Sequence, residues 1–112
     1  MPGNEVPLEG LLSELRRGTL VLCVLSQLRE RQYGYSLSQG LAEKGMDVEQ
    51  GTLYPLLRRL EKQGLLDSDW TLEEARPRRY YVLSARGRKM LEDLTREWDG
   101  MVKVIDRMLD RQ

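Results

Sequence analysis

The chain has 112 residues, of which 40% are hydrophobic, and its 18 Lys and Arg residues balance its 18 Asp and Glu residues. This length supports one domain with one core, and no stretch has the unbroken apolar length of a membrane span. A net charge of zero is not the strongly basic composition expected of a nucleic-acid-binding protein, so any such function must rest on how the charges are distributed.

The residue types that enzymes and metal sites use most often are scarce. Histidine is absent and there is one cysteine, which removes the commonest general base and the usual zinc ligands. We therefore expect no catalytic site, no metal site and no cofactor. Cys23 lies within the apolar run 20–25, which predicts a buried, unreactive thiol. The N-terminal residues have no secretion-signal pattern, and together with the single cysteine this favours a cytoplasmic protein.

The first part of the chain predicts an arm followed by a helix. Residues 1–10 include two prolines and two glycines and are expected to form a flexible N-terminal arm. Apolar residues at helical spacing, followed by the solid apolar run 20–25, predict one buried central helix over Leu11–Glu30. Gly18 is the residue at which this helix could break.

The next segment has the ingredients of a helix-turn-helix. We expect a turn at Gln32–Tyr35, in which Gly34 is free to take a positive φ. A short helix over Ser36–Lys44 follows, with Ser36 as its N-cap and Gly45 after its end. Met46–Gln50 then leads to a third helix that ends near Gln63. Two short helices joined by a tight turn are typical of this DNA-binding motif.

The third helix carries two different faces. Its apolar stripe consists of Leu53, Leu56, Leu57 and Leu60. Pro55 requires that the helix either begins late or bends, because proline has no N–H to donate to the carbonyl of Gly51. The polar side chains remain available to bases and phosphates, since Gln, Thr and Arg are the residue types that read base edges. An ordinary solvent-exposed face is the alternative interpretation. The candidate groups are Gln50, Thr52, Tyr54 and Arg58.

A hairpin is predicted directly after this helix. Strands are expected at 65–70 and 78–83, flanking a loop at 71–77, and such a hairpin is the wing of a winged helix. The window 76–89 holds six basic residues and no acid, so it could bind DNA or simply form a solvated face. Glu73 and Glu74 in the loop should repel phosphates, which argues against deep insertion of the tip.

The last helix, expected over Ala85–Asp110 with Ser84 as its cap, carries a heptad seam. A domain of this size should not cover the whole stripe, which favours a homodimer. Packing against residues 20–28 of the same chain is the alternative. The residues expected at the dimer interface are Leu91, Leu94, Trp98, Met101, Val102, Ile105, Met108 and Leu109.

Three blocks of sequence resemble the PadR family of transcriptional regulators. They are Tyr33-Gly34-Tyr35, then Gly51-Thr52-Leu53-Tyr54-Pro55 with Arg59-Leu60-Glu61, and finally Arg78–Gly87. The resemblance runs from about Leu15 to Leu109, and the length is similar to the short subfamily, which has a single C-terminal dimerisation helix.

The resemblance implies a mainly α fold with a small β-hairpin (α+β). This is a winged helix-turn-helix at residues 11–84 followed by a dimerisation helix at 85–112. It also implies a repressor that binds double-stranded DNA as a homodimer on a pseudo-palindromic operator and responds to a small molecule. Carried over to this chain, Tyr35 and Ser36 would approach phosphates, Gln50, Thr52, Tyr54 and Arg58 would lie at the major groove, and Arg78 and Arg79 would hold the backbone or minor groove.

Trp98 is the candidate for effector binding. In some short family members a tryptophan at this place pairs with its copy across the dimer and sandwiches planar aromatic molecules. Here Trp98, Asp99 and Met101 would form that site, although a tryptophan that only fills the dimer interface is an equally simple interpretation. Two other functions stay open: a winged-helix protein-interaction module that does not bind DNA, and a small-molecule sensor or carrier.

Overall fold

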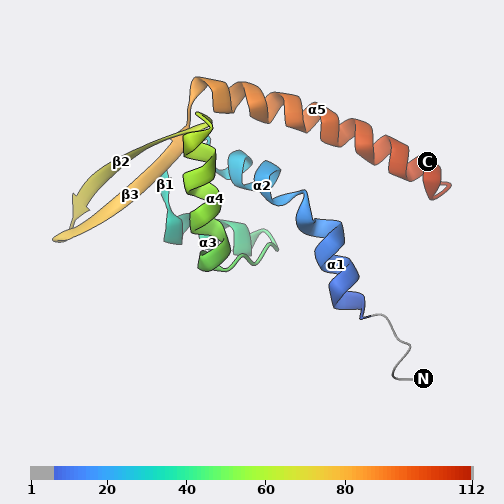
Figure 1. Cartoon of the computed structure of the whole chain (residues 1–112), viewed down its shortest axis with the longest axis horizontal. Coiled ribbons are helices and arrows are strands. Elements are labelled where there is room, and N and C mark those ends of the chain that lie inside the picture. Colours follow the sequence, from blue (N-terminus) through green and yellow to red (C-terminus); the bar gives the residue numbers. More distant parts are fainter. Residues whose placement is uncertain (1–6, 112) are drawn as a thin grey trace.

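The computed structural model describes residues 7–111 as an elongated molecule of 56 × 36 × 24 Å. A winged helix-turn-helix forms one end, and the long C-terminal helix runs away from it, opposite the wing (Figure 1). This confirms the predicted α+β fold. The elements within the described range are α1 (Leu8–Arg17), α2 (Leu20–Gln27), β1 (Gln32–Tyr33), α3 (Gly34–Glu43), α4 (Gln50–Lys62), β2 (Leu66–Glu73), β3 (Arg76–Leu83) and α5 (Ala85–Met108).

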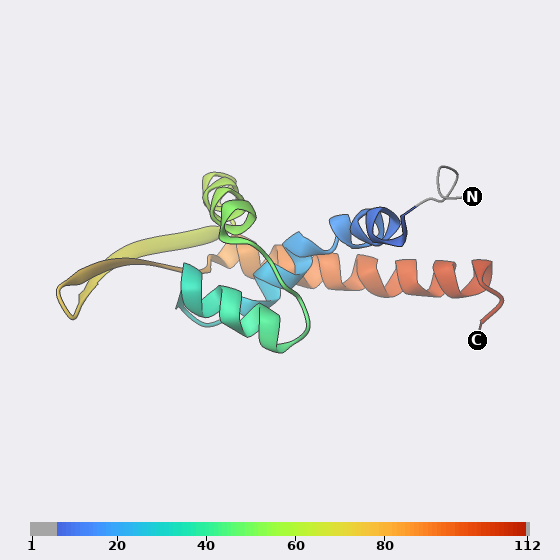
Figure 2. The same cartoon turned by 90° about the horizontal axis from the view of Figure 1, so that it is seen from below.

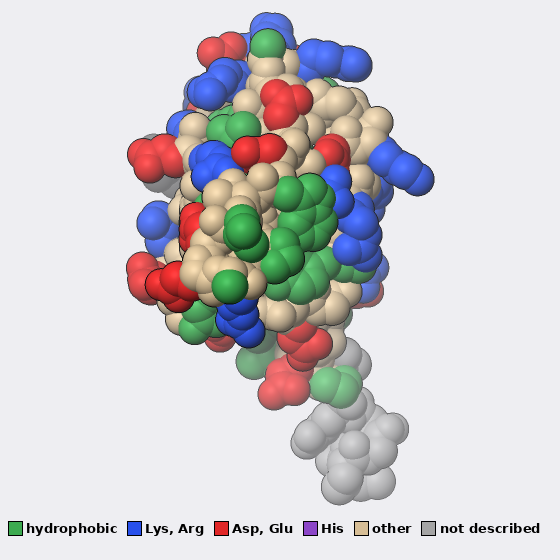
Figure 3. Space-filling model, turned by 90° about the vertical axis from the view of Figure 1, so that its left-hand side faces the viewer, with side chains coloured by type: hydrophobic (Ala, Val, Ile, Leu, Met, Phe, Trp, Pro, Cys, Tyr) green, Lys and Arg blue, Asp and Glu red, His purple; other side chains and the backbone are tan. Residues whose placement is uncertain are grey.

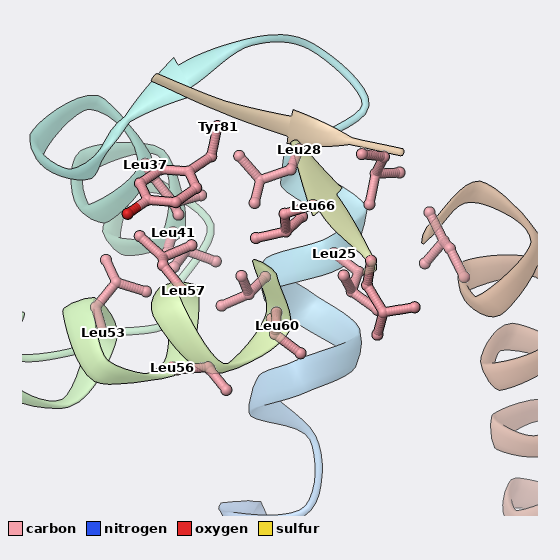
Figure 4. Packing of buried hydrophobic residues seen from close by; sticks show 14 residues of the cluster. Leu25, Leu28, Leu37, Leu41, Leu53, Leu56, Leu57, Leu60, Leu66 and Tyr81 are labelled. Carbon is pink, nitrogen blue, oxygen red and sulfur yellow. The ribbon is translucent and has the colours of Figure 1, made fainter. Parts of the chain in front are cut away.

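The core lies where α2, α3 and α4 meet the base of the sheet (Figure 4). Leucines dominate it, and the predicted stripe of α4 is buried there as expected. Tyr81 of β3 points into the same cluster, and Leu91 of α5 closes it with 5% of its surface exposed. The first turns of α5 therefore belong to the winged domain. The most deeply buried side chains are Val24, Leu25, Leu28, Leu37, Leu53, Leu57 and Leu60.

The expected central helix is wrong in one respect, because the chain breaks at Gly18 and Thr19 into α1 and α2. The Thr19 backbone N–H and side-chain hydroxyl both donate to the Arg16 carbonyl, at 3.0 and 2.7 Å, and so close the end of α1. The first helix also begins at Leu8, within the predicted arm, and residues 1–6 of that arm lie outside the described residues. None of the residues of α1 is buried. In Figure 2 both α1 and α5 extend away from the wing, and Figure 1 shows the two helices diverging from each other.

The start of α3 also differs from the prediction. Gly34 is helical and does not have a positive φ, and Ser36 is the third residue of the helix rather than its N-cap. The backbone N–H of Tyr33 donates to Ser36 Oγ at 3.2 Å, and Ser36 Oγ donates to the Tyr33 carbonyl at 3.0 Å. Gly45 follows the end of the helix with φ +99°, as predicted.

The helix α4 begins at Gln50 and runs through Pro55, so of the two alternatives for this proline the late start is wrong. The backbone N–H groups of Thr52 and Leu53 both donate to the Glu49 carbonyl at 2.9 Å, which secures the first turn ahead of the proline. Gly64 then takes φ +80° directly after the helix.

The wing is longer than expected, since Thr71 and Pro77 lie within strands rather than in a loop. The strands β2 and β3 pair antiparallel from Leu66–Leu83 to Glu73–Arg76. They are joined by Glu74 and Ala75 alone, with φ of 48° and 61°, which is the backbone of a tight two-residue hairpin turn. The short strand β1, which the sequence did not reveal, pairs with β3 to give the sheet order β1-β3-β2.

The long helix α5 is capped as predicted, because Ser84 Oγ accepts from the Gly87 backbone N–H at 3.0 Å. Gly87 lies so close to the chain after α4 that an added Cβ would fall 2.0 Å from the Leu65 carbonyl oxygen. Among residues 7–111, no helix combines the length and the apolar character needed to cross a membrane.

Candidate nucleic-acid interface and helical groove

The side chains predicted to read bases lie on the outer side of α4. Gln50, Thr52 and Arg58 are exposed, while the four leucines of the opposite stripe hold the helix against the core. Arg58, Arg59 and Lys62 form no ion pair within residues 7–111. The helix therefore presents cationic groups that are free to meet an anionic partner.

Tyr54 has a second role that the sequence did not indicate. Its ring packs on Gly34 at the start of α3, where an added Cβ would fall 2.1 Å from Tyr54 Cε1. The side chain keeps 38% of its surface exposed. Gly34 is thus required for the close approach of α3 and α4, and Tyr54 fixes the first turns of one helix against the other.

The two α3 residues predicted to approach phosphates differ in exposure and in the hydrogen bonds of their hydroxyl groups. Tyr35 is 52% exposed, and its hydroxyl accepts a hydrogen bond from Gln39 Nε2 at 2.8 Å. Ser36 is half-buried, and its hydroxyl is occupied by the Tyr33 backbone. Tyr35 is available at the surface, whereas Ser36 has a structural task at the start of the helix.

The wing arginines are both paired with acids. Arg79 lies 2.7 Å from Glu61 Oε1 of α4, and its Nε donates to Ser68 Oγ at 3.2 Å. Arg78 lies 2.9 Å from Glu73 Oε2. Glu73, expected to repel phosphates as part of a loop, is instead a strand residue whose charge Arg78 offsets.

Arginine and tyrosine side chains stack on one another on the face of the wing that carries Arg78 and Tyr80. The Arg31 guanidinium lies 3.8 Å from the centre of the Tyr80 ring, and that of Arg78 lies 4.6 Å from the Tyr33 ring. Such cation–π contacts stabilise exposed sites modestly. Tyr80 donates to Glu73 Oε1 at 2.7 Å, and this hydrogen bond is the main cause of the raised pKa of Tyr80. This cluster could not be predicted from the sequence, because β1, which carries Tyr33, is only two residues long.

The basic window 76–89 does not form one surface. Arg76 lies beside the hairpin turn, and Lys89 of α5 pairs with Asp93 at 3.2 Å. Arg88 lines a separate hollow with Arg29 and Arg96. The turn into α5 separates the two halves of the window, and only its first half belongs to the wing.

A groove of about 720 Å³ lies between the α1–α2 break and α5. Trp98 and Met101 line it, with Leu15 and Leu22 on the opposite wall. Asp99 is exposed and is not among the lining residues that the structure describes. The carboxylates of the groove come from Glu14 and Glu97.

The expected dimer seam divides into two parts. Leu91 belongs to the core of its own protomer and is not available to a second copy, which corrects its assignment, and Leu94 packs against the same core. Beyond them the seam residues reach the surface, except Val102, which is half-buried. Those exposed by 39–79% are Trp98, Met101, Ile105, Met108 and Leu109.

Cys23 is half-buried rather than fully buried, and it packs against the core. Burial raises the pKa of its thiol. The thiolate is thereby disfavoured, in line with the expected low reactivity.

Comparisons with known proteins agree on one family. The PadR-like family of transcriptional regulators matches residues 21–93. A transcriptional regulator of Mycobacterium tuberculosis is 36% identical over 94 residues, covering 77% of this chain and 88% of its own length. A PadR family regulator of Eggerthella lenta shares 44% identity over 94% of both chains, with a TM-score of 0.88. A PadR-like transcription factor of Bacteroides fragilis shares 33% identity over 88% of this chain and 98% of its own, with a TM-score of 0.75. The chain belongs to the PadR-like family of transcriptional regulators.

Proposed function

We propose that this protein regulates transcription by binding double-stranded DNA as a homodimer, with α4 in the major groove. The observation that carries the proposal is the exposed outer side of α4, where Arg58, Arg59 and Lys62 have no acidic partner within residues 7–111. Gln50 and Thr52 lie at the start of the same helix, where recognition helices contact base edges.

Dimerisation is supported by apolar surface that one protomer leaves uncovered. The distal half of α5 exposes its seam, and α1 exposes Leu8, Leu11 and Leu15 by 52–73%. Large exposed apolar areas mark interaction sites in soluble proteins. A two-fold dimer would place two α4 helices about 34 Å apart, which predicts a pseudo-palindromic operator.

The test is duplex binding measured by fluorescence anisotropy over a range of salt concentrations. Affinity should fall steeply with salt. Arg58→Ala should weaken binding by about 1–3 kcal/mol if the side chain reads a base, or reduce the salt slope by about 1 if it meets a phosphate. Lys103→Ala is the matched control, since Lys103 is an exposed cation on α5, remote from α4. Equal binding by the Arg58 and Lys103 variants would contradict the proposal and favour a protein-interaction module.

A small-molecule effector is a second proposal, favoured by the groove at Trp98. The groove combines an aromatic ring with the carboxylates of Glu14 and Glu97, a setting that suits planar cations. A ligand there would fill the groove between the α1–α2 break and α5, and we infer that its binding relieves repression. Planar cationic dyes should quench Trp98 emission in a Trp70→Phe background, and Trp98→Ala should abolish dye binding. Unchanged dye binding by Trp98→Ala would exclude this site.

A further inference from the structure

The wing has two chemically different faces, which follow from its strand register. Side chains of paired residues lie on the same side of a sheet, and successive residues alternate. One face, here called the charged face, carries all three acids of β2, which are Asp67, Asp69 and Glu73. The other face carries Trp70 opposite Arg79 and Leu72 opposite Pro77. We call the Trp70, Leu72 and Pro77 surface the apolar face.

The apolar face is open to solvent. Trp70 exposes 64% of its surface and Leu72 exposes 73%, although both belong to a well-paired strand. Pro77 is also exposed. Side chains of this size exposed together on one face of a hairpin mark a contact surface, because a single protomer gains nothing from them in packing.

The apolar face continues directly into the outer side of α4. Arg79 lies between the two, with its guanidinium 5.7 Å from the Trp70 ring and 2.7 Å from Glu61 of α4. Tyr81, next on the same face, points into the core below α4. Figure 3 views this end of the molecule, where hydrophobic side chains gather beside Lys and Arg side chains. A partner that covers α4 therefore meets the apolar face as well.

The charge pattern identifies duplex DNA as the partner that fits. Every acid of β2 lies on the charged face, where Arg31 pairs with Asp69 at 3.1 Å and Arg78 pairs with Glu73. The hairpin turn contains Glu74, so entry of the tip into a groove would bring a carboxylate to phosphates. On the apolar face the strands present no acid, and Glu61 at its margin is neutralised by Arg79.

We propose that the wing meets the duplex with its apolar face rather than with its tip. This inference rests on the proposed DNA-binding function and deepens it. Trp70 and Leu72 lie flat on the deoxyribose edges of the minor groove next to the major groove that holds α4. Large apolar side chains are compatible with this place, since minor-groove proteins bring such side chains to the base steps of the groove. The contact buries surface without releasing counterions, so it adds affinity that salt does not screen.

The test compares Trp70→Ala and Leu72→Ala with wild type by duplex binding at about 50 and 200 mM salt. Each variant should weaken binding by about tenfold, or about 1.4 kcal/mol, by the same factor at both salt concentrations. Met90→Ala is the control, because Met90 is an exposed apolar residue of α5 outside the wing. Circular dichroism should be unchanged, since both wing side chains are exposed.

A second measurement follows the indole itself. In a Trp98→Phe background, duplex should protect Trp70 emission from acrylamide. Wild-type affinity in both alanine variants, or Trp70 emission that stays fully quenchable in the complex, would overturn the inference while leaving the proposed function intact. Absence of duplex binding by the wild-type protein would overturn both.

Discussion

Glu61 of α4 and Arg79 of β3 form an ion pair with 2.7 Å between Oε1 and Nη2, and this pair joins α4 to the wing. Ser68 of β2 completes the contact, since its hydroxyl donates to the second Glu61 oxygen and accepts from Arg79 Nε. The helix and the hairpin therefore present one continuous surface. Arg79 is therefore already paired with a carboxylate of its own chain, and this ion pair must open before Arg79 can bind a phosphate.

Removing the Glu61 charge should release Arg79. We expect Glu61→Gln to steepen the salt dependence of DNA binding by up to about 1 in slope, because one more cation becomes free for phosphates. The loss in folding stability should stay below about 1 kcal/mol, since both side chains are roughly one-third exposed. Salt titration of duplex binding checks the slope, with Glu92→Gln on exposed α5 as the control. An unchanged slope would show that Arg79 does not reach DNA even when it is free.

Gly34 should not tolerate a side chain. Gly34→Ala places a Cβ 2.1 Å from the Tyr54 ring, and the necessary shift should lower the free energy of unfolding by about 1–3 kcal/mol. Gly40→Ala, in the same helix but with nothing within 4 Å, should be neutral or stabilising by up to about 1 kcal/mol. Urea unfolding compares the two. Equal stabilities would refute the close contact between α3 and α4, and Tyr54→Ala should rescue Gly34→Ala.

A second glycine pair tests how α5 is attached. Gly87→Ala would bring a Cβ to 2.0 Å from the Leu65 carbonyl oxygen, a backbone atom that cannot rotate away. We expect a loss of at least about 2 kcal/mol in thermal or urea unfolding, because α5 must move off the core. Gly100→Ala meets nothing within 4 Å and should not destabilise the fold. A Gly87→Ala variant as stable as Gly100→Ala would contradict the close contact between Gly87 of α5 and the Leu65 carbonyl.

The dimer proposal predicts a specific sensitivity to charge on α5. Ile105→Glu places an unpaired carboxylate in the exposed seam and should convert the dimer to monomer at micromolar concentration, since burying such a charge is costly. Lys103→Glu, exposed on another side of the helix, should leave the dimer intact. Sedimentation equilibrium distinguishes these outcomes. A wild-type protein that is monomeric throughout would contradict the proposal.

Tyr81 should make folding stability depend on alkaline pH. Burial raises its pKa above the ordinary value of 10.0, while the nearby charges of Arg79 and Arg58 oppose this shift. A tyrosine whose pKa is raised by folding contributes to the free energy of unfolding, and this contribution is complete below the ordinary pKa of 10.0. It is lost as the pH rises through the higher pKa of the folded state. Tyr81→Phe should therefore lose less stability between neutral and alkaline pH. Urea unfolding across this range tests it, and parallel curves would count against burial of the hydroxyl.

The sequence predicted the elements whose signals are long and periodic. The leucine stripe of α4, the Ser84 cap and the glycine end of α3 are where the pattern placed them. The break between α1 and α2 at Gly18 was harder to predict, because the apolar spacing continues across it and α1 buries none of its residues. Propensity also suggested Ser36 as a cap, whereas tertiary contact between Gly34 and Tyr54 placed the helix start earlier.

The contacts of the candidate site were less predictable than its residues. Glu61 and Arg79 are 18 positions apart and Arg31 and Asp69 are 38 apart, so these pairs form only once α4 packs against the sheet and β1 pairs with β3. Alternation along β2 places its acids on one face and Trp70 and Leu72 on the other. The sequence could not show which face lies toward α4, since a shift of one residue in the pairing would exchange the two faces.

The most direct test of the account is selection of bound sequences from a random duplex pool by the full-length protein. The account predicts enrichment of an inverted repeat with half-sites about one helical turn apart, read by two copies of α4, and loss of that enrichment with Arg58→Ala. A pool that stays random after repeated rounds with the wild-type protein, or an enriched site that Arg58→Ala selects equally well, would contradict it.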